Sequence, residues 1–271
     1  MNARGSSWLS LGVLWLVVVA TALVTRPLLP VDETRYATVA WEMWARGDFL
    51  VPHLNGEPYS HKPPLFFWLI HAGWWLFGVS EWVVRSVAPL LAAGALLATA
   101  LLSRRLWPDA PEPARMAPWL VFGCVFLTAF CSWVQIDLLL VVCTLLALTG
   151  VVSAAQGTRR GWLLTGVALG CGVLSKGPVI LVHVLPVALF APLWRPGAQA
   201  GAWWRWYAGL AMSVLLAAGI ALGWALPAAA AGGDAYREAL LWGQNADRLV
   251  GSFAHAHPVG WYLPWLPLLF A

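Results

Sequence analysis

Residues 62–78 read KPPLFFWLIHAGWWLFG, and the way this stretch meets a membrane decides the fold of everything after it. It has about the minimum length for a helix that crosses a bilayer, which needs roughly 20 apolar residues. It also opens with two prolines and is crowded with aromatic side chains, which favour the membrane interface. The two alternatives place every loop after residue 78 on opposite sides of the membrane.

The composition predicts a protein that crosses a membrane many times. Of 271 residues, 61% are hydrophobic and 10% are charged, with a mean hydropathy of +0.73. A soluble core cannot bury so much apolar surface, so we expect an all-α polytopic membrane protein. The net charge of +4 includes no basic run, and we expect no nucleic-acid partner. Candidate spans are 8–25, 82–103, 117–135, 138–156, 161–175, 178–194 and 206–227, with an eighth beginning near residue 259.

The positions of the arginines decide between the two alternatives for residues 62–78. If that stretch lies at the surface, the loops on one side of the membrane hold Arg4, Arg104, Arg105, Arg115, Arg159, Arg160, Arg195 and Arg205, against only Asp109 and Glu112. Such a bias is typical of cytoplasmic loops. If the stretch crosses, all of these arginines except Arg4 move outside. The charges therefore favour a surface position, with residues 26–81 forming an external loop that carries interfacial helices.

An amphipathic helix is predicted directly after the first span. Apolar residues recur with a period of 3.6 from Tyr36 to Trp44 and stop at Gly47, which indicates a helix in the membrane plane. The pattern places Asp32 at the N-cap, with Glu33 favouring the helix dipole. Capping does not exclude catalysis, because an N-cap carboxylate is fixed in direction and partly desolvated. Both roles stay open for Asp32 on these residues alone.

Further polar residues converge on the same external face. Asn55-Gly56 predicts a tight turn that presents Tyr59, His61 and Lys62 just before two prolines. Lys62 can extend to the headgroup level or hold a lipid phosphate.

Three more charged groups lie at the outer ends of the spans. Asp137 lies between two spans with almost no loop to hydrate it, which indicates either a functional acid or a helix cap. Lys176 lies in a turn between spans, and its surroundings do not fit a phosphate-binding loop. Arg248 precedes the eighth span. The nearby His255 and His257 are weak evidence for a metal site.

Residues 32–85 resemble one family closely. The motifs are DETRY at residues 32–36, GDFLVPHLNGEPYSHKPPLFFWL at 47–69 and GVSEWVVRSVAPLL from residue 78. They are similar to bacterial polyprenyl-phosphate-sugar glycosyltransferases of the GT-C superfamily, the lipid A aminoarabinose transferase and dolichyl-phosphate-mannose-protein mannosyltransferase family. The resemblance implies a GT-C transmembrane helix bundle with periplasmic interfacial helices, a periplasmic active site and an isoprenoid-phosphate sugar donor.

The resemblance also implies roles for individual residues. Asp32 is the expected catalytic carboxylate and Asp137 the second acid. The expected substrate-binding residues are Glu33, Arg35, Tyr36, Tyr59, Lys62, Lys176 and Arg248. In a metal-binding relative, a carboxylate stands where this chain has His61 and a histidine stands where it has Asn245. We therefore expect transfer that requires no cofactor, with His61 as the candidate ligand if a divalent metal binds.

The predicted activity is transfer of a sugar from a polyprenyl-phosphate donor to a glycolipid, such as lipid A, or to a protein. Such a donor already carries its leaving group, so the enzyme needs a base, cations for the phosphate and a groove for the lipid. The alternative is a lipid-linked substrate transporter or flippase, because intramembrane acids also mark ion pathways. Transport sites lie near the membrane midplane, whereas these acids gather at one edge.

The resemblance also implies where the protein resides. It implies a multi-pass protein of the bacterial inner membrane with its active site facing the periplasm. Residues 1–271 are expected to form the N-terminal part of a catalytic module, because the chain ends inside an apolar segment with no polar flank.

Overall fold

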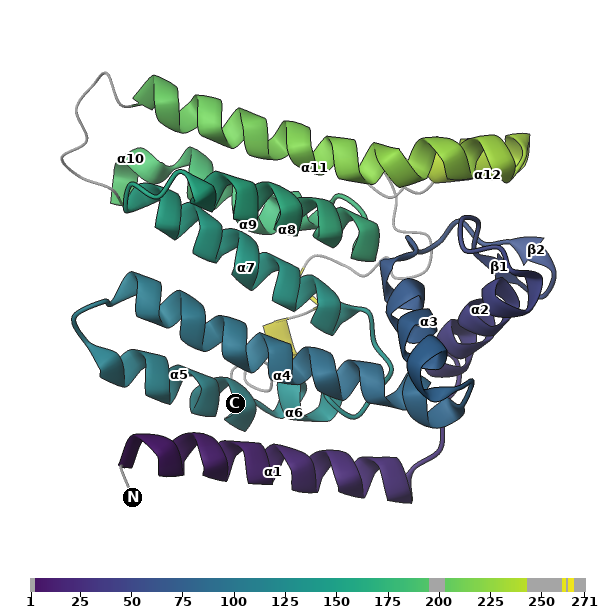
Figure 1. The fold of residues 1–271 in the computed structure, drawn as a ribbon, viewed down its shortest axis with the longest axis horizontal. Coiled ribbons are helices and arrows are strands. Elements are labelled where there is room, and N and C mark those ends of the chain that lie inside the picture. The colour runs from purple at the N-terminus through teal and green to yellow at the C-terminus, as the bar shows by residue number, and fades with distance from the viewer. Residues whose placement is uncertain (1–2, 195–202, 243–259, 262, 266–271) are drawn as a thin grey trace.

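The computed structural model describes residues 3–194, 203–242, 260–261 and 263–265 of the chain. Most of the helices run roughly parallel in one layered bundle, and α2, α3 and a short β-hairpin lie across one end of it (Figure 1). The helices of the bundle are α1 (Ala3–Thr25), α4 (Glu81–Leu106), α5 (Pro111–Gly123), α6 (Val125–Phe130), α7 (Asp137–Ala155), α8 (Arg160–Lys176), α9 (Val179–Leu189), α10 (Ala191–Trp194) and α11 (Trp203–Ala231), followed by the short α12 (Asp234–Glu238) and a 3₁₀ turn at Leu263–Trp265.

Four of the described helices are long and apolar enough to cross a membrane: residues 8–25 of α1, and α4, α7 and α11. Two predicted spans are divided. The span predicted at 117–135 is the pair α5 and α6, interrupted at Cys124, whose backbone is extended. The span predicted at 178–194 is α9 followed by α10. Most of the eighth predicted span lies outside the described residues.

Glycines let the central helices approach closely. The helix α8 packs most extensively against α7 and α11. Gly150 of α7 and Gly161 of α8 face each other so closely that a Cβ on either would come within 2.6 Å of the other's carbonyl oxygen. Gly170 makes room in the same way for Ile220 of α11. Small residues of this kind are what allow helices to pack in a membrane, where no hydrophobic force drives them together.

The helix α2 (Asp32–Arg46) follows the predicted amphipathic pattern. It buries Tyr36, Val39, Ala40 and Met43. This face packs against α3 (Leu65–Phe77), which contributes the fully buried Phe66, Phe67 and Ile70. The Nε2 atom of His71 bonds to the carbonyl oxygen of Ala40 at 2.9 Å and ties the two helices together. The predicted helix and its buried face are therefore confirmed.

The tight turn at Asn55-Gly56 joins β1 (His53–Leu54) to β2 (Glu57–Pro58) as an antiparallel hairpin. Both turn residues have positive φ angles, 55° and 88°, as a two-residue hairpin turn requires. The Glu42 carboxylate of α2 accepts hydrogen bonds from the two turn amides, at 2.5 and 2.9 Å. The hairpin is thus attached to α2, and it holds Tyr59 and the residues after it in place.

The stretch 62–78 does not run along the bundle. Its helix α3 lies with α2 at one end (Figure 1), and its last residues Trp75, Leu76 and Phe77 are 72–84% exposed. Its position agrees with the surface prediction. The turns at the opposite end carry Arg104, Arg105, Arg115, Arg159, Arg160 and Arg205, together with Asp109 and Glu112. The predicted separation of charges between two ends is therefore present in the described part of the fold.

Candidate functional site

The first acid of the site, Asp32, is not the N-cap of α2. Val31 occupies the cap position, no side chain caps the helix, and Asp32 is the first helical residue. This corrects the capping prediction. The Asp32 side chain is 51% exposed, and its nearest charged partner is the guanidinium of Arg35, 3.4 Å away. The carboxylate is therefore accessible to a ligand.

The neighbouring Glu33 has a different environment, because it is 3% exposed. Arg26 binds its carboxylate with two nitrogens, at 2.5 and 2.9 Å, and the amide of Leu29 donates to it at 2.6 Å. The amide of Val134 donates to the same carboxylate at 2.5 Å. Val134 is 101 residues away in the chain, so Glu33 links the start of α2 to the loop that leads into α7.

The second acid, Asp137, begins α7 and is paired with Lys176 at the end of α8. The Lys176 Nζ lies 2.5 Å from Oδ1 of Asp137, and the two side chains are 34% and 45% exposed. Ile136, not Asp137, occupies the cap position of α7, and no side chain caps that helix. The predicted capping alternative for Asp137 is therefore wrong. The turn of α8 into α9 presents the lysine beside the acid instead.

Tyr36 connects the two acids electrostatically. Burial raises the pKa of its phenol above the usual range. The negative charges of Asp32 and Asp137, and that of Tyr59 once it is ionised, raise the pKa further against the opposing effect of Arg35. Groups on α2, the hairpin and α7 therefore act on one phenol. Because the phenol stays neutral at ordinary pH, its hydroxyl can donate a hydrogen bond to an anionic ligand.

A largely apolar cavity of about 320 Å³ begins beside Lys176. Its walls come from the segment after the hairpin, the α8–α9 turn, α11 and the segment after α12. The lining residues are Ser60, His61, Pro63, Val173, Leu174, Lys176, Gly177, Pro178, Ala221, Leu222, Trp224, Ala225, Leu240 and Leu241. The indole of Trp224 donates to the carbonyl oxygen of Leu50 at 2.9 Å and so fixes α11 against the loop before the hairpin.

The remaining predicted site residues divide into two groups. Tyr59 is 7% exposed and stacks on the His61 ring with 5.2 Å between ring centroids, and the partly buried Lys62 follows directly. Arg248 lies outside the described residues, as does the His255/His257 pair. Within the described ranges, no group of three or more His, Cys, Asp or Glu side chains could hold a metal ion. His61 therefore has no set of co-ligands there.

Two arginines that sequence reasoning did not single out hold this end of the bundle together. One is Arg26, the partner of Glu33. The other is Arg85 of α4, which is 8% exposed and donates to the carbonyl oxygens of Ala22, at 2.9 Å, and Arg26. Arg85 thereby adds a donor to the Ala22 carbonyl, which also accepts from the Arg26 amide, and binds the Arg26 carbonyl just after α1. A lone arginine at the start of an apolar span was the available signal for such a role.

The chain is similar to a known protein family. The model of the family described as dolichyl-phosphate-mannose-protein mannosyltransferase matches residues 61–224. The chain is 31% identical to the undecaprenyl phosphate-alpha-4-amino-4-deoxy-L-arabinose arabinosyl transferase of Edwardsiella ictaluri, over 97% of this chain and 49% of the relative. It is 33% identical to the protein of the same name from Pseudomonas aeruginosa, over 87% of this chain and 43% of the relative.

The fold is similar to that of ArnT from Cupriavidus metallidurans bound to undecaprenyl phosphate. The TM-score is 0.83 at 22% identity, and the match covers 99% of this chain and 49% of that one. The apo structure of the same protein gives 0.81. The predicted fold class, an all-α polytopic membrane protein of GT-C type, is confirmed. The chain spans about half the length of the curated relatives it matches.

Proposed function

Because the chain belongs to the dolichyl-phosphate-mannose-protein mannosyltransferase family, we propose that it forms the N-terminal part of the catalytic module of a membrane glycosyltransferase. Its donor is a sugar linked to polyprenyl phosphate, and its acceptor is a glycolipid such as lipid A, or a protein. The observation that carries the proposal is the meeting of Asp32, Tyr36 and the Asp137–Lys176 pair at one end of the bundle, beside an apolar cavity.

The proposed reaction is a single displacement at the donor sugar. A hydroxyl oxygen of the acceptor forms a bond to the anomeric carbon, and the bond from that carbon to the phosphate oxygen breaks with its electron pair on the phosphate. Asp32 takes the proton of the hydroxyl as general base, a role that typically contributes about 10²–10⁴-fold. The half-exposed carboxylate of Asp32 is suited to this role, because a ligand can reach it.

The departing phosphate requires positive charge and hydrogen-bond donors. Lys176 supplies an ammonium at the edge of the cavity, where Asp137 holds it. An ammonium has three N–H donors, so Lys176 can bind a donor phosphate while Asp137 keeps it in position. Arg35, Lys62 and the neutral hydroxyl of Tyr36 assist, with Tyr59 bracing the segment that carries Lys62. Arg248 stays a prediction from the sequence for the same role.

Glu33 is assigned a positioning role in place of the substrate contact predicted from the sequence. Its carboxylate is already bound by Arg26 and by two backbone amides. Those bonds fix the start of α2, where Asp32 lies, and the loop before α7, where Asp137 lies. Glu33 therefore sets the distance between the two acids without touching the donor.

The isoprenoid chain of the donor is proposed to occupy the cavity beside Lys176. Apolar side chains of α8, α11 and the segment after α12 provide most of its lining. An isoprenoid is purely apolar, so burial of its surface supplies affinity at about 25 cal/mol per Å². The phosphate then lies at the polar end of the cavity, next to Lys176.

The spanning helices and the similarity to the bacterial transferases identify a multi-pass protein of the bacterial inner membrane. The site is proposed to face the periplasm, because the arginine-rich turns lie at the opposite end.

The orientation can be tested with cysteines at two exposed positions, Glu57 and Thr158, which lie at opposite ends of the bundle. Both positions suit substitution because, unlike the nearby Asn55 and Gly157, neither has a positive φ angle. In a cysteine-free background, an impermeant thiol reagent should label Glu57→Cys but not Thr158→Cys on intact cells. The reverse pattern would invert the orientation.

The activity itself is tested with the full-length protein in proteoliposomes. The donor is an undecaprenyl-phosphate-linked aminosugar and the acceptor is lipid A. Mass spectrometry should find one released undecaprenyl phosphate for each acceptor that gains a sugar. Movement of intact donor across the bilayer without cleavage would support the transporter alternative and reject the transferase.

A further inference from the structure

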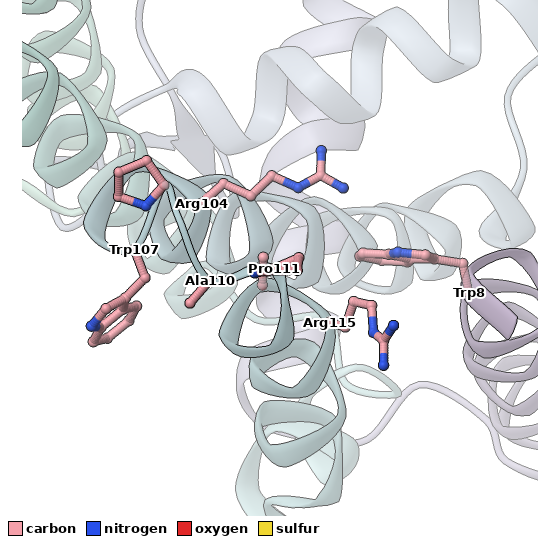
Figure 2. Close-up of a pocket in the computed structure, with 8 residues that line it drawn as sticks. Trp8, Arg104, Trp107, Ala110, Pro111 and Arg115 are labelled. Carbon is pink, nitrogen blue, oxygen red and sulfur yellow. The ribbon is translucent and has the colours of Figure 1, made fainter.

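A second pocket lies at the opposite end of the bundle, far from the candidate site. It is formed where the start of α1 meets the end of α4 and the start of α5, and it encloses about 450 Å³. Its lining residues are Trp8, Arg104, Trp107, Pro108, Ala110, Pro111, Ala114 and Arg115. In the view of Figure 2, the Trp8 ring extends from α1 toward the other two helices, and Arg104 and Arg115 extend on either side of it.

The pocket carries positive charge that the described residues neutralise only in part. Arg104 takes part in no ion pair among the described residues. Arg115 contacts Glu112 at 2.7 Å, but both side chains are exposed to solvent, 32% and 62%, and are only three residues apart on one helix. Exposed pairs of this kind contribute little net stability, so Arg115 can exchange this carboxylate for another anion. No acidic side chain lines the pocket itself.

The two tryptophans place the pocket at the level of lipid headgroups. Tryptophan is enriched where the apolar membrane core meets water. Trp8 packs its ring against the cluster of Leu11, Leu96 and Phe122, which joins α1 to α4 and α5. Trp107 is half-exposed at the end of α4. Beside them, Leu9, Met116 and Leu120 are more than 50% exposed and offer apolar surface to acyl chains.

We propose that this pocket binds the headgroup of an anionic phospholipid. The phosphate lies between Arg104 and Arg115, the tryptophan rings flank the glycerol region, and the acyl chains run along α1 and α5. Basic pockets between transmembrane helices on the arginine-rich side are suited to such headgroups. The lipid would hold α1 against α4 and α5 at this end, since most of α1 is not covered by protein. This site is separate from the proposed donor site, which lies at the other end of the bundle.

The test compares lipids and matched variants of the full-length protein in detergent. Dioleoyl phosphatidylglycerol is expected to raise the melting temperature of the wild type, whereas the zwitterionic phosphatidylcholine and inorganic phosphate do not. The Arg104→Gln/Arg115→Gln variant should bind phosphatidylglycerol roughly tenfold or more weakly, because each lost bond is charge-assisted. The control Arg105→Gln/Arg160→Gln removes two arginines from the same end outside the pocket and should keep the wild-type shift.

Equal losses in the two double variants would overturn the proposal, because they would show attraction to the whole charged face. An equal shift with phosphatidylcholine would also overturn it, since the headgroup charge would then be irrelevant. A rise in melting temperature with inorganic phosphate would also overturn it, because the pocket would then bind a free anion and not a lipid headgroup. The single variant Arg104→Gln, whose melting temperature without lipid should match the wild type, keeps the test decisive if the double variant does not fold. Sugar transfer is not needed for any of these measurements.

Discussion

The two ends of the helix bundle use charge in opposite ways. At the end that carries α2 and α3, acids and bases are paired, and two of the pairs connect different elements: Arg26 with Glu33, and Asp137 with Lys176. At the other end, Arg104, Arg105, Arg159, Arg160 and Arg205 take part in no ion pair within the described ranges. Paired charges hold groups at fixed distances, as chemistry requires. Unpaired arginines leave charge for anionic lipids.

Loss of Glu33 should have the largest effect on stability. Glu33→Gln leaves Arg26 buried without its counter-charge, and breaking a buried ion pair costs about 3–5 kcal/mol. Denaturant unfolding in detergent measures the loss. The matched control Glu112→Gln removes an exposed partner 2.7 Å from the partly exposed Arg115 and should cost less than about 1 kcal/mol. Full stability of Glu33→Gln together with a raised KM for the donor would restore a substrate contact for Glu33.

Separation of Asp137 from Lys176 should reduce turnover strongly. Asp137→Asn removes the charge that holds Lys176 at the cavity, and loss of one preorganised electrostatic partner typically costs about 10²–10³-fold in kcat. Asp109→Asn removes an acid from the opposite end and should leave kcat close to that of the wild type. Single-turnover sugar transfer measures both. Equal activity of the two variants would show that the acids at the two ends do not differ in their role in transfer.

Tyr36 should lower stability at high pH. Its folded pKa is raised by burial and then by Asp32, Tyr59 and Asp137, so above the usual tyrosine pKa of about 10 the unfolded chain ionises first. The free energy of unfolding then falls by up to about 1.4 kcal/mol per pH unit. Tyr36→Phe should remove part of this fall between pH 9 and 11 in thermal melts. The remainder belongs to Tyr236, whose pKa burial also raises. An unchanged pH profile would place Tyr36 outside the cluster.

The smallest expected effect is that of His61. Its ring stacks on Tyr59 at the cavity edge, and the described residues offer no co-ligands for a metal. His61→Ala should therefore lower activity without abolishing it, and a chelator should leave the wild type active. If a chelator abolishes activity and zinc or magnesium restores it, a metal takes part in the reaction and the prediction is wrong.

The sequence predicted what depends on local pattern and on the sum of charges. The apolar face of α2, the Asn55-Gly56 turn and the surface position of residues 62–78 all follow from periodicity, turn chemistry or arginine placement. The two acids of the site were candidates from their positions in the chain, and the family resemblance implied their catalytic roles. Each of these signals lies within a short window or is averaged over whole loops.

Long-range contacts could not be predicted in this way. The bond from the amide of Val134 to Glu33 joins residues 101 apart, and Lys176 contacts Asp137 across 39 residues. No local pattern in the sequence predicts either contact. The error on Asp32 has a similar cause. A cap is predicted from residue type, but Val31 occupies the cap position, so the Asp32 carboxylate makes no capping bond and is half-exposed. Of the two roles that the sequence left open for Asp32, only that of a base then remains.

The most direct test of the account is single-turnover transfer by Asp32→Asn beside Asp234→Asn, an exposed acid of the same end that is paired with Arg237. Donor binding is measured on the same preparations. The account predicts that Asp32→Asn binds the polyprenyl-phosphate sugar with wild-type affinity and transfers it at least about 10²-fold more slowly, whereas Asp234→Asn transfers normally. Wild-type transfer by Asp32→Asn would contradict the account and remove Asp32 from the reaction.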